Sequence, residues 1–143
     1  MKKLILFTLT MLMLLTACNS ESAANSTLST TEEVTSEEPT LNYQQITQDE
    51  AKQIITDEEN YIILDVRTQS EYDEGHIPNA ICVPNETIGS NDIPELPDKE
   101  QLILVYCRSG RRSKEAAAKL ADMGYTNIKE FGGIIDWTGD VVK

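Results

Sequence analysis

The feature that most constrains this chain is a cysteine that stands between an apolar run and a helical pattern. The apolar run covers residues 102–106, the helical pattern covers residues 113–123, and Cys107 begins the short stretch between them. A junction of this kind brings backbone N–H groups and the positive end of a helix dipole together. Three arginines follow the cysteine within five residues: Arg108, Arg111 and Arg112. These surroundings stabilise a thiolate, the reactive form of cysteine, and form a cradle for a small anion.

An unreactive core cysteine is the alternative interpretation, because free cysteines are commonly packed as small apolar side chains. The residues after Cys107 argue against it, since guanidinium groups are almost never buried without a partner. We therefore interpret Cys107 as a nucleophile that meets an anionic substrate. The residues expected to bind that anion are Arg108, Ser109, Gly110, Arg111 and Arg112.

The stretch from Cys107 to Ser113 resembles the active-site loop of single-domain rhodanese-like sulfurtransferases. Other segments resemble the same family in the same order and at about the same spacing, so that the resemblance covers residues 41–143. These segments are Leu64-Asp65-Val66-Arg67, Glu71-Tyr72, Gly75-His76-Ile77-Pro78-Asn79-Ala80, Phe131-Gly132-Gly133 and Trp137. The resemblance implies the rhodanese fold, an α/β domain with a parallel sheet and helices on both faces.

The order of local patterns predicts the same architecture. Strand-like runs alternate with helical patterns, which is typical of a parallel sheet covered by helices on both faces, and no internal repeat indicates a second domain. Strands are expected at residues 43–46, 61–65, 81–83, 102–106 and 127–131. Helices are expected from a Thr47–Glu50 capping box to about Thr56, at residues 70–74 with Ser70 as the cap, and from Ser113 to a stop at Gly124. Gly132 and Gly133 are expected to turn the chain into a short helix that carries Trp137.

The N-terminal residues have the pattern of a secretory signal. Lys2 and Lys3 precede an apolar stretch, residues 4–15, that is too short to span a bilayer. The following Leu15-Thr16-Ala17-Cys18 resembles the bacterial lipobox, in which the cysteine is lipidated and becomes the new N-terminus. We expect residues 1–17 to be a lipoprotein signal peptide, with an ordinary secretory signal cleaved at the same place as the alternative.

Residues 18–40 connect this signal to the folded part. They begin with the lipidated Cys18, are rich in Ser, Thr and Glu, and contain no aromatic residue, so we expect them to form a disordered tether. Two acyl chains anchor a protein stably to a membrane. The domain of residues 41–143 is therefore expected on the extracytoplasmic face of a bacterial membrane, held by the lipid on Cys18.

Composition limits the partners. The formal net charge of −12 disfavours nucleic acid, no cofactor is expected, and a single histidine, His76, removes any His-rich metal site. His76 could serve as a general base, but the resemblance implies a structural place in a turn, and we expect the latter. A disulfide between Cys82 and Cys107 is conceivable outside the reducing cytosol and would block the nucleophile, but Cys82 is expected to be a packed small side chain.

The resemblance also implies a mechanism, which is a two-step transfer of sulfane sulfur. The Cys107 thiolate attacks a donor such as thiosulfate, and the resulting persulfide gives its sulfur to cyanide or a thiol. Arg108 and Arg111 are expected to attract the anion. Asp65, Arg67 and Glu71 are expected to support the site, with Arg112 paired to Glu71 or Asp65 and with Arg67 holding loops together by ion pairing.

Two other functions use the same cysteine. A persulfide carrier or sensor that serves a protein partner needs Cys107 equally. Phosphatases that share this fold look like Cys-x5-Arg, whereas the arginine here is Arg112, five positions after Cys107, and Ser113 stands at the sixth. A shorter loop presents fewer N–H groups to a phosphate. The phosphatase is therefore less favoured than the sulfurtransferase, and arsenate reduction less still.

Overall fold

The computed structural model describes residues 42–89 and 91–143. The predicted signal peptide, the lipidation site Cys18 and the predicted tether lie outside these residues. The strands are Gln44–Gln45 (β1), Tyr61–Asp65 (β2), Ile81–Cys82 (β3), Leu102–Cys107 (β4) and Ile128–Gly133 (β5). The helices are Gln48–Asp57 (α1), Gln69–Glu74 (α2) and Arg111–Asp122 (α3), with 3₁₀ turns at Asn85–Thr87 (η1) and Ile134–Asp136 (η2).

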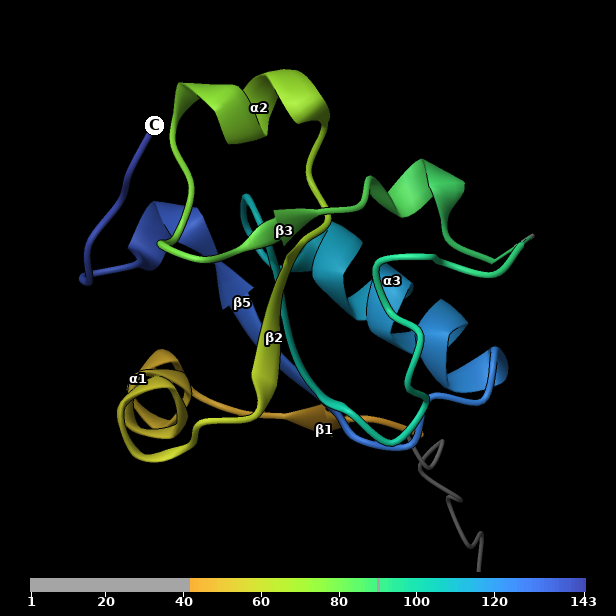
Figure 1. Cartoon of the computed structure of the whole chain (residues 1–143). Helices are drawn as coiled ribbons and strands as arrows, with labels where there is room; N and C mark the ends of the chain where they lie inside the picture. Colours follow the sequence, from red (N-terminus) through yellow and green to blue (C-terminus); the bar gives the residue numbers. More distant parts are fainter. Residues whose placement is uncertain (1–41, 90) are drawn as a thin grey trace, which may run out of the picture. The chain divides into compact units, whose positions relative to one another are not determined.

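The strands form one parallel sheet in the order β1-β5-β4-β2-β3 (Figure 1). Strand β4 lies at its centre, and successive side chains of a strand point to opposite faces. Ile103 and Val105 pack on the face covered by α3, against Ala116, Ala117 and Leu120. Leu104 and Tyr106 pack on the other face, in a cluster that includes Ala51 of α1 and Phe131. The predicted α/β class, with helices on both faces of a parallel sheet, is confirmed.

Helix α2 begins earlier than the sequence predicted. Its N-cap is Thr68, whose hydroxyl accepts a hydrogen bond from the Glu71 N–H at 3.3 Å. The Glu71 carboxylate accepts in return from the Thr68 N–H at 3.2 Å. The prediction that Ser70 caps this helix is wrong, because a capping box needs a glutamate three residues after the cap. The box fixes the Glu71 carboxylate at the start of α2.

The elements around Cys107 also differ in their bounds from the prediction. Strand β4 includes Cys107, and α3 begins at Arg111 because Gly110, with φ 96°, is its N-cap. Strand β5 continues through Gly133, which pairs with Cys107 and is also the N-cap of η2, so the two glycines lead into a short helix as expected but do so as the last residues of the strand. The short η2 ends before Trp137, which packs against Phe131 with ring centroids 5.6 Å apart.

The C-terminal segment braces the turn that contains His76. The backbones of His76 and Val142 exchange two hydrogen bonds of 2.9 Å in an antiparallel bridge. The His76 ring stacks on Tyr72 with centroids 3.7 Å apart. These contacts confirm the structural place expected for His76. No helix within residues 42–89 and 91–143 has the length and apolar character needed to cross a membrane.

Candidate active site

Cys107 ends the central strand and faces the beginning of α3. It lies on the same sheet face as Ile103 and Val105, and it is only 1% exposed. Three residues, Arg108 to Gly110, connect it to the 12-residue helix α3. The Gly110 N–H donates a hydrogen bond to the Cys107 sulfur at 3.1 Å. The sulfur therefore lies where unpaired N–H groups and the positive end of the helix dipole meet.

Hydrogen bonding makes this thiol more acidic than an ordinary cysteine. Burial raises the pKa of Cys107, but hydrogen bonds from the Ser113 hydroxyl and from backbone N–H groups outweigh burial and lower the pKa overall. The N–H groups belong to Ser113, Ser109 and Gly110. Donors that converge on a sulfur favour its thiolate.

Cys82 has the opposite environment. Burial, with a smaller effect of the Asp65 charge, raises the pKa of Cys82 to about 11. Its S–H lies 3.6 Å from the Arg67 carbonyl oxygen, and both Cys82 and Cys107 are free thiols. Cys82 is thus a packed, protonated side chain in this structure, and the conceivable Cys82–Cys107 disulfide is not formed.

Two glycines of β5 form the floor under the Cys107 loop. A Cβ atom added at Gly133 would collide with the backbone of Arg108 and Ser109. One added at Gly110 would lie 3.6 Å from the Gly132 Cα. The loop therefore rests directly on the β5 backbone, which requires a glycine at position 133, whereas Gly132 is favoured by its positive φ of 93°.

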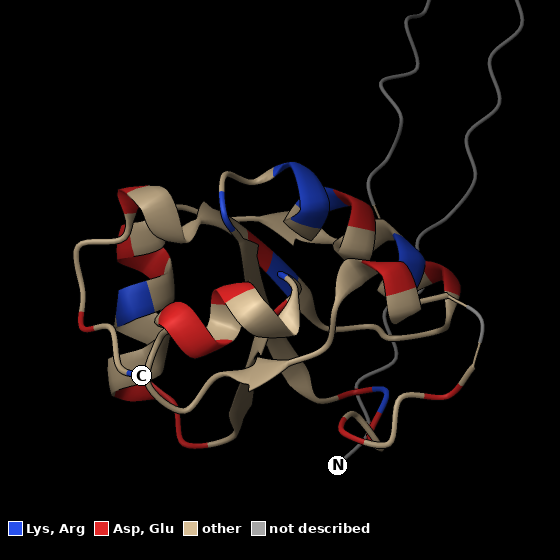
Figure 2. Cartoon of the chain, turned by 90° about the horizontal axis from the view of Figure 1, so that it is seen from above, with Lys and Arg blue, Asp and Glu red and all other residues tan. Residues whose placement is uncertain are grey.

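The three arginines have different surroundings. Arg112 forms a two-point ion pair with Glu71, with Nη1–Oε2 2.7 Å and Nη2–Oε1 2.8 Å, so that Glu71 is its partner rather than Asp65, the other expected candidate. Arg111 is exposed and 3.4 Å from Glu115. Arg108 is exposed and makes no ion pair within the described part of the chain. Figure 2 shows basic residues gathered where α3 begins. Of the three arginines, Arg108 and Arg111 are therefore the two whose side chains are exposed.

A buried ion pair braces the end of β2. Arg67 contacts the Asp65 carboxylate through Nε and Nη2, with an Nη2–Oδ2 distance of 2.6 Å. The same Nη2 donates to the Gly75 carbonyl at 2.7 Å and so ties β2 to the end of α2. The expectation that Arg67 holds loops together is confirmed. Asp65 and Arg67 shape the frame around the loop, and their hydrogen bonds join them to each other rather than to Cys107.

The sequence prediction missed one residue of this site, Glu130. It is only 2% exposed, and its Oε1 accepts from the Ser113 hydroxyl at 2.6 Å and from the Gly132 N–H at 2.9 Å. The available signal was an acidic residue inside the predicted strand 127–131. A carboxylate is rarely fully buried without hydrogen-bond partners, so a glutamate at this position indicates specific contacts with neighbouring segments.

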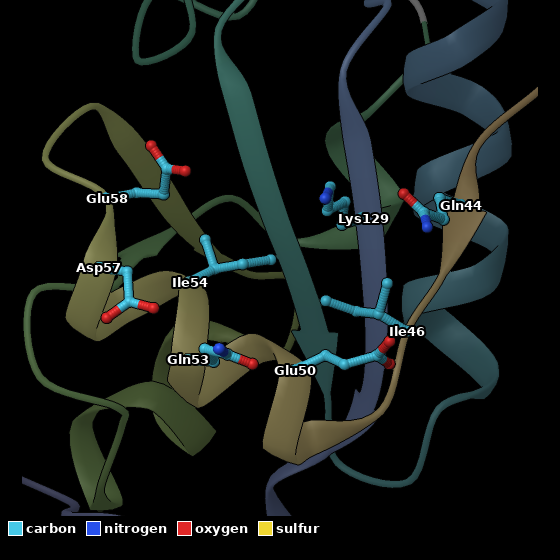
Figure 3. Close-up of a pocket in the computed structure, with 8 residues that line it drawn as sticks. All are labelled: Gln44, Ile46, Glu50, Gln53, Ile54, Asp57, Glu58 and Lys129. Atoms are coloured by element: carbon cyan, nitrogen blue, oxygen red, sulfur yellow. The ribbon is translucent and has the colours of Figure 1, made fainter.

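Two hollows lie near these elements. One, of about 400 Å³, adjoins the Cys107 loop, and its lining residues include Gln48, Ser109, Gly110, Lys114 and Glu130. The other, of about 270 Å³, lies between α1 and β5 and contains no loop residue (Figure 3). Within residues 42–89 and 91–143, no three His, Cys, Asp or Glu side chains are grouped in a way that could hold a metal ion.

The two thiols should react at different rates. With iodoacetamide near pH 7, we expect Cys107 to be modified at least about tenfold faster than Cys82, because only the thiolate reacts. Peptide mapping by mass spectrometry at successive times measures both rates in one sample. The denatured protein is the control, in which the rates should converge. Equal rates in the folded protein would contradict the pKa difference.

The Glu71–Arg112 pair should stabilise the fold in a pH-dependent way. Hydrogen bonds from Arg112 lower the pKa of Glu71 from 4.5 to about 2. Stability gained from the ionised carboxylate is then present above pH 4.5 and is lost as pH falls toward about 2. Glu71→Gln should lower the free energy of unfolding at neutral pH by about 1 kcal/mol, as for a partly exposed ion pair.

Urea unfolding at a series of pH values measures this effect. The difference between wild type and Glu71→Gln should shrink as pH falls below 4.5. Glu95→Gln, a change at an exposed glutamate of the connection between β3 and β4, is the matched control and should have little effect. A Glu71→Gln difference that stays constant down to low pH would refute the linkage.

Known proteins similar to this chain identify its family. The family described as "Rhodanese-like domain" matches residues 47–140. Thiosulfate sulfurtransferase PspE of Escherichia coli is 36% identical over 80 residues, which cover 56% of this chain and 77% of PspE. A protein named "Sulfurtransferase" from Allochromatium vinosum is 36% identical over 94 residues, or 65% and 86% of the two chains. A solved structure described as "rhodanese with anions from E. coli" is 34% identical, with a TM-score of 0.54, and covers 58% of this chain and 98% of its own. The chain therefore belongs to the rhodanese-like domain family.

Proposed function

We propose that this protein is a sulfurtransferase that moves sulfane sulfur from an anionic donor, such as thiosulfate, to a thiophilic acceptor through a persulfide on Cys107. The observation that carries the proposal is the Cys107 sulfur at the end of β4, with hydrogen-bond donors of the following loop directed at it. The names of the two sulfurtransferase relatives, and the anions in the similar rhodanese structure from E. coli, support it.

The first step forms the persulfide. The Cys107 thiolate attacks the outer sulfur of thiosulfate, a new S–S bond forms, and the old S–S bond breaks so that sulfite leaves with its electron pair. The terminal sulfur then carries the negative charge. The backbone N–H groups of Ser109 and Gly110 are placed to hold that charge without any change in the protein's own protonation.

The second step returns the enzyme to its starting state. Cyanide or a thiolate attacks the terminal sulfur, the persulfide S–S bond breaks, and Cys107 again carries the negative charge. Neither step requires a histidine base, which agrees with the structural position of His76. Arg108 and Arg111 raise the local concentration of the anionic donor at the mouth of the loop, an effect that salt screens.

The enclosure of the sulfur favours sulfur transfer over phosphate chemistry. Cys107 is 1% exposed, and the loop reaches Arg112 after only five positions. A single terminal sulfur atom needs less room and fewer donors than a phosphoryl group with three outer oxygens. Arg112 is also engaged by Glu71, so it does not face a bound oxyanion freely. These features disfavour a phosphatase and also an arsenate reductase, which the sequence had favoured less still.

Replacing the proposed nucleophile tests the function. Cys107→Ser should reduce thiosulfate-to-cyanide sulfur transfer by at least about 10³-fold, because a serine hydroxyl does not form a stable persulfide analogue. Cys82→Ser is the matched control and should keep most of the activity. Circular dichroism checks both folds. Mass spectrometry after thiosulfate treatment should find one added sulfur on Cys107 in the wild type.

Other outcomes separate the alternatives. A properly folded Cys107→Ser protein that retains most activity would refute the assignment. Loading of one sulfur without turnover on any small acceptor would instead favour a persulfide carrier that serves a protein partner. A wild type with higher kcat/KM for aryl phosphates than for thiosulfate would favour the phosphatase.

We further propose that the domain is held at the extracytoplasmic face of a bacterial membrane by lipid on Cys18. The basis is the sequence alone: Lys2 and Lys3, the apolar stretch 4–15 and the lipobox-like Leu15-Thr16-Ala17-Cys18. Metabolic labelling with a fatty acid should tag the wild type but not Cys18→Ala, and the variant should leave the membrane fraction or remain unprocessed. A wild type without label would contradict the lipid anchor.

A further inference from the structure

Glu130 is a buried carboxylate beside the Cys107 loop that the proposed sulfur transfer does not use. It lies on β5, two residues before Gly132, and no lysine or arginine pairs with it among the described residues. Its carboxylate accepts hydrogen bonds from the Ser113 hydroxyl at 2.6 Å and the Gly132 N–H at 2.9 Å, both on the same oxygen. A buried charge without a cationic partner is costly, so its retention needs a reason.

These two contacts join the first turn of α3 to β5, the strand on which the Cys107 loop rests. Ser113 lies in the first turn of α3, and its hydroxyl is also 3.0 Å from the Gly110 carbonyl oxygen. Gly132 belongs to the β5 floor on which Gly110 rests. One oxygen of Glu130 therefore holds the helix end of the loop against the strand beneath it. The Gly110 N–H, which donates to the sulfur, is positioned between these two points.

The Ser113 hydroxyl has a single proton and more than one acceptor. Besides Glu130, it lies near the carbonyl oxygens of Gly110 and Gly132, at 3.0 and 3.2 Å. The Glu130 oxygen, at 2.6 Å, is the nearest of these acceptors, so the proton is directed toward Glu130. The same hydroxyl lies beside the Cys107 sulfur and lowers the pKa of that thiol when it donates there, so Glu130 and the sulfur compete for one proton.

Glu130 thus has two effects of opposite sign on an anionic sulfur. Its hydrogen bonds hold the loop donors in place, which favours the anion. A negative charge on this carboxylate, which is one hydrogen bond away from the Ser113 hydroxyl beside the sulfur, acts against the anion by like-charge repulsion. The other charged groups around the site are Arg112 from α3, which favours the anion and is paired with Glu71 of α2, and Lys114, which lines the same hollow as Glu130. Tyr43 is a neutral neighbour of Glu130.

We infer that Glu130 is a positioning residue that fixes the Cys107 loop through Ser113 and Gly132 while its charge keeps the anionic sulfur from being bound too tightly. This inference rests on the proposed function, in which the sulfur must be accepted and then released. A persulfide held too strongly would load but would pass its sulfur on slowly, since tighter ground-state binding does not speed the chemical step.

Two substitutions separate the charge from the clamp. Glu130→Gln keeps an acceptor oxygen for Ser113 and Gly132 but removes the charge, so the midpoint of Cys107 alkylation against pH should fall by about 1 unit. Ser113→Ala keeps the carboxylate but removes both one contact of the clamp and the hydroxyl beside the sulfur, so the midpoint should rise by a similar amount. Glu95→Gln, at an exposed site, should leave the midpoint unchanged.

Alkylation with iodoacetamide needs no sulfur donor, so this measurement is independent of the proposed function. Opposite shifts of the alkylation midpoint in the two variants support the inference about Glu130, whether or not the wild type transfers sulfur. A wild type that transfers no sulfur would refute only the proposed sulfurtransferase activity. If the wild type does transfer sulfur, loaded Glu130→Gln should release it to cyanide severalfold more slowly. Unchanged midpoints, or shifts of the same sign that follow the loss of thermal stability, would overturn the inference and leave Glu130 as a packing residue.

Discussion

The structure around the site depends on one interaction, the contact between the Cys107 sulfur and backbone N–H groups of the loop that follows it. Backbone donors are neutral and fixed by the chain, so they stabilise an anionic sulfur without adding a mobile charge. This requires a short loop in a narrow conformation. Gly110 supplies the positive φ that starts α3, and Gly133 lets the loop lie directly on β5. The glycines of two distant segments are thus part of the same requirement.

The ion pairs of the site stabilise this geometry by joining the segments that surround the Cys107 loop. Arg112 and Glu71 join the first turn of α3 to the start of α2, and Arg67 and Asp65 join the end of β2 to the end of α2. Both pairs cross between elements that follow the carboxyl ends of parallel strands. That edge of an open α/β sheet is where loops form a binding site, and it has no sheet hydrogen bonds of its own to hold them. Charge-assisted hydrogen bonds provide the missing rigidity.

The sequence predicted the parts of this arrangement that depend on local pattern. The buried run of β4, the helical spacing of α3 and the Thr47–Glu50 capping box are each readable within about a dozen residues, and the structure has all three. For Arg112 the sequence left two carboxylate partners open, Glu71 and Asp65, and the structure has Glu71. The cap of α2 was wrong because two hydroxyl residues, Thr68 and Ser70, compete there, and only the glutamate three residues on decides between them.

What the sequence did not predict are contacts between distant segments. The clash that excludes a side chain at Gly133, and the contact of Glu130 with Ser113, involve residues 17 or more positions apart that meet only when β4 and β5 pair. Arg108 and Arg111 are exposed at the loop, while the groups that donate to the sulfur are neutral: backbone N–H groups and the Ser113 hydroxyl. Under the proposed function, the exposed arginines attract the incoming anionic donor, whereas neutral donors at the sulfur suit a charge that has to leave again.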